Sequence, residues 1–260
     1  MRPTAIRRTA VAATMMSLAL LTAACGSDAA DKDGGSKGKV DESASAKPAA
    51  AKALTAAELE KASLAQGDVK GHKITKAGPA DAVSAGDVTA DKAACDVFAD
   101  TLMGAKAGSP AASTQRKVIS EPKKGADQDS ADPEEAFEAA FDITTTLTTL
   151  SSYEGKGAEE TVAALRTAAT GCASGFTMKA AGTKQKVVKI AEEQVKAGED
   201  AAAWTVTVES DGEKSAMKLV QVRQGATVAS FSALNLAAAS SGGDFELPKA
   251  VIDAQMAKLA

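Results

Sequence analysis

Residues 203–231, AWTVTVESDGEKSAMKLVQVRQGATVASF, decide the predicted fold of this chain. From Trp204 to Val208 apolar and polar residues alternate, which is the period-two pattern of a strand with one buried face. Asp211-Gly212 is a strong signal for a tight hairpin turn, and Gln224-Gly225 marks a second reversal of the chain. The stretch therefore predicts an antiparallel meander of consecutive strands.

The residues before and after this meander predict both helices and further strands. Thr55 followed by Glu58 forms a capping box, which places the start of the folded domain near Leu54. Apolar stripes at helical spacing predict helices over 89–103, 158–171 and 248–259. Shorter β-rich runs predict strands over 69–74, 113–120, 143–150, 177–179 and 186–190. We expect one α+β domain over 54–260, a twisted antiparallel sheet with helices packed mainly on one face.

The first twenty-five residues have the organisation of a secretory signal. Three arginines precede an apolar stretch over 9–21, and small residues lead to Cys25. The sequence LTAAC over 21–25 resembles the lipobox of bacterial lipoproteins, although Thr22 stands where that family usually has leucine. The resemblance implies a signal peptide over 1–24, a fatty-acyl group such as palmitate on Cys25, and attachment to the outer face of the cell membrane. The alternative is an ordinary secreted protein cleaved after Ala24.

Composition limits the classes of partner. The whole chain has a net charge of −4, and removing the three arginines of the signal leaves −7. This acidic balance argues against nucleic acid and anionic lipid head groups as partners. Residues 25–53 carry almost no large apolar side chain, so we expect a flexible tether there. No later stretch approaches the ~20 apolar residues of a membrane-spanning helix, which leaves the lipid as the expected contact with the membrane.

Two cysteines remain once Cys25 is assigned to the lipid. Cys95 and Cys172 are an even pair in an exported chain, for which a disulfide is the default expectation. A metal site has little support, because His72 is the single histidine and no C-x-x-C spacing occurs. We therefore expect neither a metal nor another cofactor.

The motif search leaves the biochemical function open. The chain lacks the G-x-S-x-G, Walker A, G-x-G-x-x-G and H-E-x-x-H patterns, and one histidine excludes most Ser-His and Cys-His mechanisms. Three hypotheses remain: a non-catalytic ligand-binding or sensing module, an envelope enzyme that uses carboxylates, and an accessory lipoprotein that binds a protein partner. An apolar cleft with a few convergent polar groups would favour the first. Clustered acids with perturbed pKa values would favour the second, and a flat exposed apolar patch the third.

The order of features along the mature chain resembles a known family. That order is a first helix with Leu59 and Leu64, Cys95 in a second helix, Tyr153 after a Thr-rich strand, a helix with Leu165 and Arg166 that ends at Cys172, Phe176, a Trp204 strand, and a turn at Arg223 and Gly225. It resembles the domain of actinobacterial, Streptomyces-like lipoproteins and of the extracellular sensors of PknH-like receptor kinases. The resemblance implies an α+β fold with a cleft for an extracellular ligand. It transfers no ligand-binding residues.

Overall fold

Within the described residues, nine strands form one antiparallel sheet in the order β1-β3-β4-β9-β8-β7-β6-β5-β2. The computed structural model describes residues 52–79, 81–83, 86–122, 139–180 and 182–260, which all lie in one compact unit, Lys47–Ala260. The strands are β1 His72–Lys76, β2 Val88–Ala90, β3 Ala112–Ser120, β4 Thr144–Ser152, β5 Phe176–Ala180, β6 Thr183–Glu193, β7 Asp200–Ser210, β8 Glu213–Gln224 and β9 Thr227–Asn235. The helices are α1 Ala56–Ala62, η1 Ala93–Cys95, α2 Asp96–Leu102, α4 Gly157–Gly171, α5 Leu236–Ser241 and α6 Lys249–Leu259.

The predicted meander is confirmed as β7, β8 and β9. Strand β7 pairs with β8 through the turn at Asp211 and Gly212, and β8 pairs with β9 through the turn at Gly225. Asp211 and Gly212 both have positive φ, 52° and 87°, as a two-residue hairpin turn that follows the sheet twist requires. The Thr-rich strand β4 then pairs with β9 and places the earlier half of the chain beside the meander.

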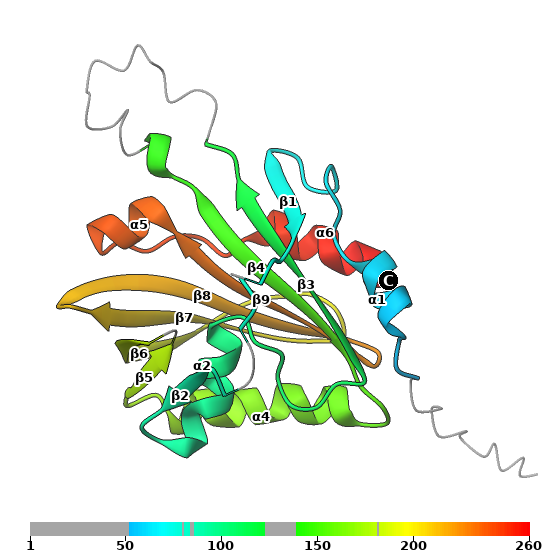
Figure 1. Cartoon of the computed structure of the whole chain (residues 1–260), viewed down its shortest axis with the longest axis horizontal. Helices are drawn as coiled ribbons and strands as arrows, with labels where there is room; N and C mark the ends of the chain where they lie inside the picture. The colour runs from blue at the N-terminus through cyan, green and yellow to red at the C-terminus, as the bar shows by residue number, and fades with distance from the viewer. Residues whose placement is uncertain (1–51, 80, 84–85, 123–138, 181) are drawn as a thin grey trace, which may run out of the picture. The chain divides into compact units, whose positions relative to one another are not determined.

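Helices pack on both faces of the sheet, so the expectation of one helical layer is wrong. On one face α2 and α4 cover Trp204, Val206 and Leu219, while α1 and α6 cover Ala203 and Val220 on the other. Neighbouring residues of a strand point to opposite faces, so β7 and β8 are buried on both sides. Figure 1 shows α4 and α6 on opposite sides of the strands. The α+β class and the antiparallel sheet are confirmed.

The core under α2 and α4 contains an aromatic ring contact. Trp204 is 4% exposed, and its ring meets that of Phe98 edge to face at 5.8 Å between centroids. This burial confirms the expectation that the single tryptophan belongs to the core. Abundant alanines from the helices and strands close the packing around the two rings.

The core under α1 and α6 is joined by polar bonds as well as apolar contacts. The capping box is confirmed, with Thr55 accepting from the Glu58 amide and the Glu58 side chain accepting from the Thr55 amide. Gln255 of α6 is fully buried and donates to the Ala62 carbonyl at the end of α1. Arg116 of β3 donates to the Leu64 carbonyl, so the chain that leaves α1 is fixed to the sheet. No helix within the described residues is long and apolar enough to cross a membrane.

Candidate functional site

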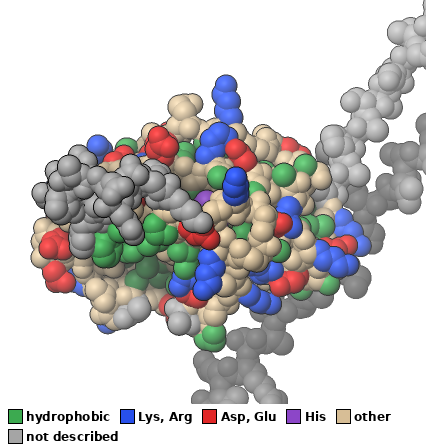
Figure 2. Space-filling view, turned by 90° about the horizontal axis from the view of Figure 1, so that it is seen from above, with side chains coloured by type: hydrophobic (Ala, Val, Ile, Leu, Met, Phe, Trp, Pro, Cys, Tyr) green, Lys and Arg blue, Asp and Glu red, His purple; other side chains and the backbone are tan. Residues whose placement is uncertain are grey.

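A hollow of the described chain lies at one end of the sheet, and we call it the α5–α6 pocket. It has a volume of about 1040 Å³ and lies between the ends of β1, β3, β4 and β9 and the segment from α5 to α6. Figure 2 looks onto this end of the molecule and shows hydrophobic side chains gathered in one patch beside charged ones. Its lining contains the apolar side chains Phe141, Phe245, Leu247, Pro248 and Val251 and the polar or charged side chains His72, Ser120, Glu121, Asp142, Thr144, Thr146, Asn235, Ser240, Ser241, Asp244, Glu246 and Lys249.

Strand residues form a polar floor. Thr144, Thr146 and Asn235 belong to two paired strands and lie on the same face of the sheet, because Thr144 pairs with Asn235 and strand residues two apart share a face. Asn235 is 3% exposed; its amide nitrogen donates to Asp142 Oδ1 at 2.8 Å and to Thr144 Oγ1 at 3.0 Å. Its amide oxygen accepts from the Ala238 amide and so caps α5. Asn235 therefore fixes the entry of α5 onto the rim of the pocket.

Thr146 is a buried residue of the floor. It is 1% exposed and lines the pocket. Two residues further along the same face of β4, Thr148 Oγ1 is buried and has no hydrogen-bond partner within the described residues, but Thr148 does not line the pocket.

One wall of the pocket is the segment 242–248 between α5 and α6, which we call the α5–α6 strap. It is fastened to the sheet by Lys218 of β8, whose side chain is 2% exposed. The Lys218 ammonium lies 2.9 Å from Asp244 Oδ1 in the strap, 2.5 Å from Glu193 Oε1 and 2.6 Å from Thr205 Oγ1. It also lies 5.6 Å from the centre of the Phe245 ring.

Lys218 sets the electrostatics of the strap. Desolvation of the Asp244 carboxyl raises its pKa, but hydrogen bonds from Lys218 and from the Phe245 amide together hold the pKa below its usual range. Asp244 is therefore ionised at neutral pH and pairs with the ammonium. This pair, with Phe245 beside it, keeps the wall of the pocket in place.

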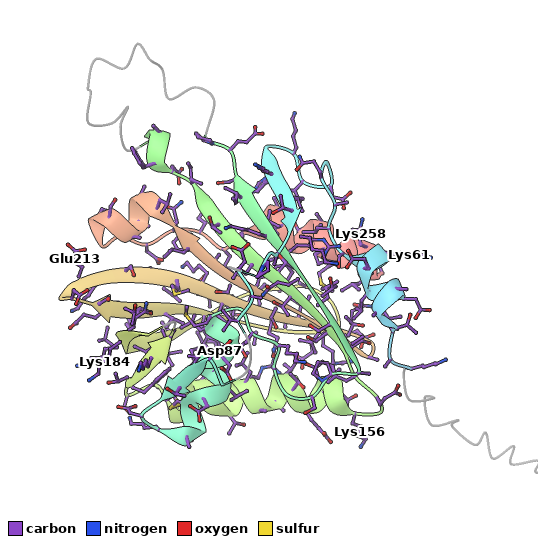
Figure 3. All side chains as sticks on the ribbon, viewed as in Figure 1. Lys61, Asp87, Lys156, Lys184, Glu213 and Lys258 are labelled. Carbon is purple, nitrogen blue, oxygen red and sulfur yellow. A yellow bond between two sulfur atoms is a disulfide. The ribbon has the colours of Figure 1, made fainter. Side chains whose placement is uncertain are left out.

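The described chain enters the domain at the opposite end of the sheet. The Leu54 amide donates to Ser152 Oγ at 2.8 Å, at the last residue of β4, whereas Thr144 of the pocket is the first residue of that strand. The two positions are roughly 26 Å apart at the rise of a β-strand. Lys258 near the C-terminus lies beside α1 at the entry end and forms an ion pair with Asp68 at 2.8 Å (Figure 3).

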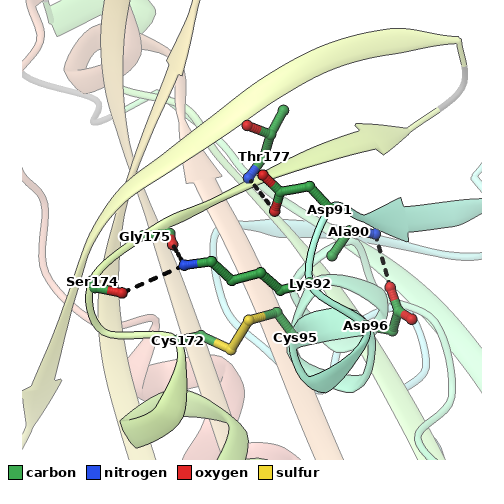
Figure 4. Close-up of a disulfide and its surroundings, with 9 residues drawn as sticks. All are labelled: Ala90, Asp91, Lys92, Cys95, Asp96, Cys172, Ser174, Gly175 and Thr177. Atoms are coloured by element: carbon green, nitrogen blue, oxygen red, sulfur yellow. Dashed lines mark hydrogen bonds between the residues drawn. A yellow bond between two sulfur atoms is a disulfide. The ribbon is translucent and has the colours of Figure 1, made fainter.

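The sequence-predicted site residues are not at the pocket. Cys95 and Cys172 form the expected disulfide, with their Cα atoms 5.9 Å apart, and it joins the start of α2 to the end of α4 (Figure 4). Lys92 beside it donates to the Gly175 carbonyl at 2.7 Å. Cys25, the predicted lipidation site, lies outside the described residues, as do the signal peptide and most of the tether.

Sequence reasoning missed the pocket, although one signal was present. The run of threonines in β4 alternates between the two faces of the sheet, which puts Thr144, Thr146 and Thr148 on one face, where Thr146 and Thr148 are buried. A polar row in a buried strand is unusual and marks either an internal hydrogen-bond network or a site. Helix α5 and the strap lie where the sequence predicts only a Gly-Ser loop, so nothing in the pattern indicated a wall opposite this row.

Comparison with known proteins finds a likeness among solved structures. No family model matches the chain. No curated protein matches it. Among solved structures, the extracellular domain of PknH from Mycobacterium tuberculosis aligns over 80% of this chain and 95% of that domain, with 13% sequence identity and a TM-score of 0.44.

Proposed function

We propose that this chain is a surface-anchored lipoprotein whose domain binds an extracytoplasmic ligand without catalysis. The observation that carries the ligand-binding part is the α5–α6 pocket, a hollow with a mixed lining of apolar and polar side chains and with polar groups at its floor. Its volume of about 1040 Å³ is of the size that small-molecule sites have in other proteins. Thr144, Thr146 and Asn235 supply the polar groups of the floor.

The acids of the pocket do not support a catalytic role. The carboxyl whose pKa is raised, that of Asp100, belongs to α2 and does not line the pocket. Its pKa rises because burial disfavours the charged form and because Asp96 and Asp87 lie near it. Among the acids of the pocket, Asp244 has its pKa lowered through Lys218, which suits a structural ion pair better than proton transfer.

Native mass spectrometry tests ligand binding. The mature protein, purified from its own host, should carry a small molecule that is released on denaturation. Ala237→Trp, which projects an indole from α5 into the pocket, should abolish this adduct, whereas Ala164→Trp on the exposed side of α4 should retain it. An adduct that survives Ala237→Trp would refute the pocket as the binding site.

Metabolic labelling tests the anchor. The basic head, the short apolar run and the small residues before Cys25 support lipidation of that cysteine. Cells grown with a labelled fatty acid should show the label on this protein in the membrane fraction. A Cys25→Ala protein that stays equally labelled and membrane-bound would overturn the proposal of an anchor at this residue.

A further inference from the structure

Strand β6 has a free edge over its second half. On one side β6 pairs with β7 as far as Glu193. On the other side it pairs with β5, but this pairing ends where Phe176 meets Val187. Beyond that point no described strand pairs with the second side of β6, which lies between β5 and β7 in Figure 1. The stretch 188–193, which we call the β6 edge, is therefore open to a further strand.

Main-chain groups in β6 alternate between its two sides. The two-residue turn after β7 closes with a hydrogen bond at Ser210, so Ser210 and every second residue before it bond to β8. The residues between them, which include Thr205, bond to β6, where Thr205 pairs with Ala191. Ala191 therefore bonds to β7, and its neighbours Ile190 and Glu192 direct their N–H and C=O groups to the β6 edge. These four groups have no main-chain partner within the described residues.

The side chains of the β6 edge carry charges of both signs. Proteins often protect an unpaired edge with a bulge or a lysine, and β6 has a bulge between Val187 and Lys189. A lysine alone would repel a second copy of the same edge. Here Lys189 and Glu193 lie on one face of the strand, two residues before and two residues after Ala191. The edge is therefore complementary to itself in charge.

Pairing about Ala191 places the opposite charges together. When two copies of β6 pair antiparallel with a two-fold axis at Ala191, Lys189 of each copy stands opposite Glu193 of the other. Ile190 of each copy then exchanges main-chain hydrogen bonds with Glu192 of the other. An axis at Glu192 would bring two glutamates face to face, and an axis at Ile190 would leave Lys189 opposite alanine. Charge therefore selects the axis at Ala191.

Both charged side chains are available to a second copy. Lys218 and Thr205 bond to Oε1 of Glu193, and its Oε2 has no partner within the described residues. Lys189 is exposed and forms no ion pair there, although Asp244 lies near enough for the lysine to help lower its pKa. The side chain of Ala191 is small, which permits the close approach of facing residues in a pair without hydrogen bonds.

We propose that the mature protein forms a two-fold dimer in which the β6 edge pairs with the β6 edge of a second copy. The second strand occupies the side of β6 that β5 leaves free, and the two sheets become continuous through the pair. The interface is short, so we expect a weak dimer in solution. The α5–α6 pocket has no lining residue from β6, so this inference goes beyond the proposed function and does not depend on it.

Cysteine cross-linking tests the position of the axis. Ala191→Cys is made in the mature chain, residues 25–260 with Cys25→Ser. Facing residues of a pair without hydrogen bonds have Cα atoms about 4.5 Å apart, a separation that a disulfide can span. With a mild oxidant this variant should form a covalent dimer at least about tenfold faster than the control Ala164→Cys, which is on the exposed side of α4.

Sedimentation equilibrium tests the role of the main-chain groups. The mature chain should associate reversibly to dimers at concentrations up to about 1 mM. Glu192→Pro removes an N–H that points to the edge and should raise the dissociation constant at least about tenfold. Glu192→Thr keeps this N–H and should leave association within about threefold of wild type. Trp204 emission and the melting temperature verify that both variants are folded.

A charge reversal tests the register. Lys189→Glu places glutamates opposite Glu193 in both halves of the pair and should weaken the dimer at least about tenfold. Lys184→Glu makes the same change in the part of β6 that pairs with β5 and should have little effect. Raising the salt concentration should weaken the wild-type dimer, because the two ion pairs are exposed.

The proposal fails on any of three results. A chain that stays monomeric at about 1 mM and cross-links no faster through residue 191 than through residue 164 has no such interface. A dimer that a folded Glu192→Pro protein still forms with wild-type affinity uses another surface. A dimer weakened equally by Lys189→Glu and Lys184→Glu responds to net charge and not to the register about Ala191.

Discussion

Phe98 and Trp204 form the contact on which the core under α2 and α4 depends most. Phe98 is fully buried and its ring meets the indole edge to face. Phe98→Ala should lower the free energy of unfolding by about 3–5 kcal/mol, because a cavity remains in a core otherwise filled by small residues. Urea unfolding followed by Trp204 emission measures this loss. Leu236→Ala, at a side chain that is 46% exposed, is the control and should cost less than about 1 kcal/mol.

Lys218 is a buried charge with two carboxylate partners, and its removal should be costly. Lys218→Met leaves Glu193 and Asp244 without their cation and should lower the free energy of unfolding by about 1–3 kcal/mol, discounted because both carboxylates are partly exposed. Lys214→Met, further along β8 at an exposed position, is the matched control.

The effect of Lys218→Met should depend on pH in a defined direction. The pKa of Asp244 is lower in the folded state than in the unfolded chain, so its ion pair stabilises the fold above about pH 4. This contribution is lost as the pH falls through the folded-state pKa. The difference in stability between wild type and Lys218→Met should therefore shrink below pH 4. A difference that stays constant to pH 2 would contradict the role of Asp244.

The pKa of the Asp100 carboxyl is shifted upward, in the opposite direction to that of Asp244, because the carboxyl is partly buried. Its Oδ1 has no partner within the described residues. A raised folded-state pKa means that the carboxyl favours folding at low pH and that this contribution is lost as the pH rises through that pKa. Asp100→Asn should thus raise the free energy of unfolding modestly at pH 7, by under about 1 kcal/mol, and not at pH 3. Thermal melts at the two pH values measure this. Asp96→Ala should instead destabilise, since Asp96 Oδ1 accepts from the Ala90 amide and alanine removes that acceptor.

At the scale of elements, the disulfide fixes α2 against α4. Cys95 and Cys172 are 77 residues apart in sequence, and the chain-entropy model gives roughly 4–5 kcal/mol for closing such a loop. The Cys95→Ala and Cys172→Ala double variant should lose up to this amount in guanidinium unfolding. Thiol labelling of the denatured, unreduced mature protein should find no free cysteine. Two labelled thiols would contradict the bridge.

Strongly patterned elements could be predicted from the sequence, and weakly patterned ones could not. The meander has a clear period of two and a decisive Asp211-Gly212 turn, and α4 has a regular stripe with Val162 and Leu165. The helix predicted over 89–103 is shorter, because Val88–Ala90 pair with β5 as an edge strand and η1 precedes α2. Long-range pairing overrides local helical spacing there.

Burial on both faces of β7 and β8 could not be predicted, because alanine occurs at both buried and exposed positions and so does not show which face of a strand is buried. Ala201 and Ala203 read as neutral positions between larger side chains, yet they pack against the α1 and α6 core. Lys218 reads as a solvent-facing residue of an alternating strand, and only the strap and Glu193 bring it inside. The pocket could not be predicted either, because one of its walls is a segment whose composition is that of a loop.

At the scale of the whole domain, the pocket and the chain entry lie at opposite ends of β4. Deleting residues 30–47 should therefore leave both the melting temperature and the co-purified adduct unchanged. The described domain begins just before the capping box of α1, and the pocket lies at the far end of β4 from that entry. Scanning calorimetry and native mass spectrometry of the shortened and the full mature chain measure the two quantities. Loss of the adduct on deletion would contradict this separation.

Under the proposed function, the hydrogen bond between Leu54 and Ser152 marks where an anchored N-terminal segment would reach the domain. That point is at the end of β4 away from the pocket, so a lipid on Cys25 would leave the mouth of the pocket clear of the attachment point.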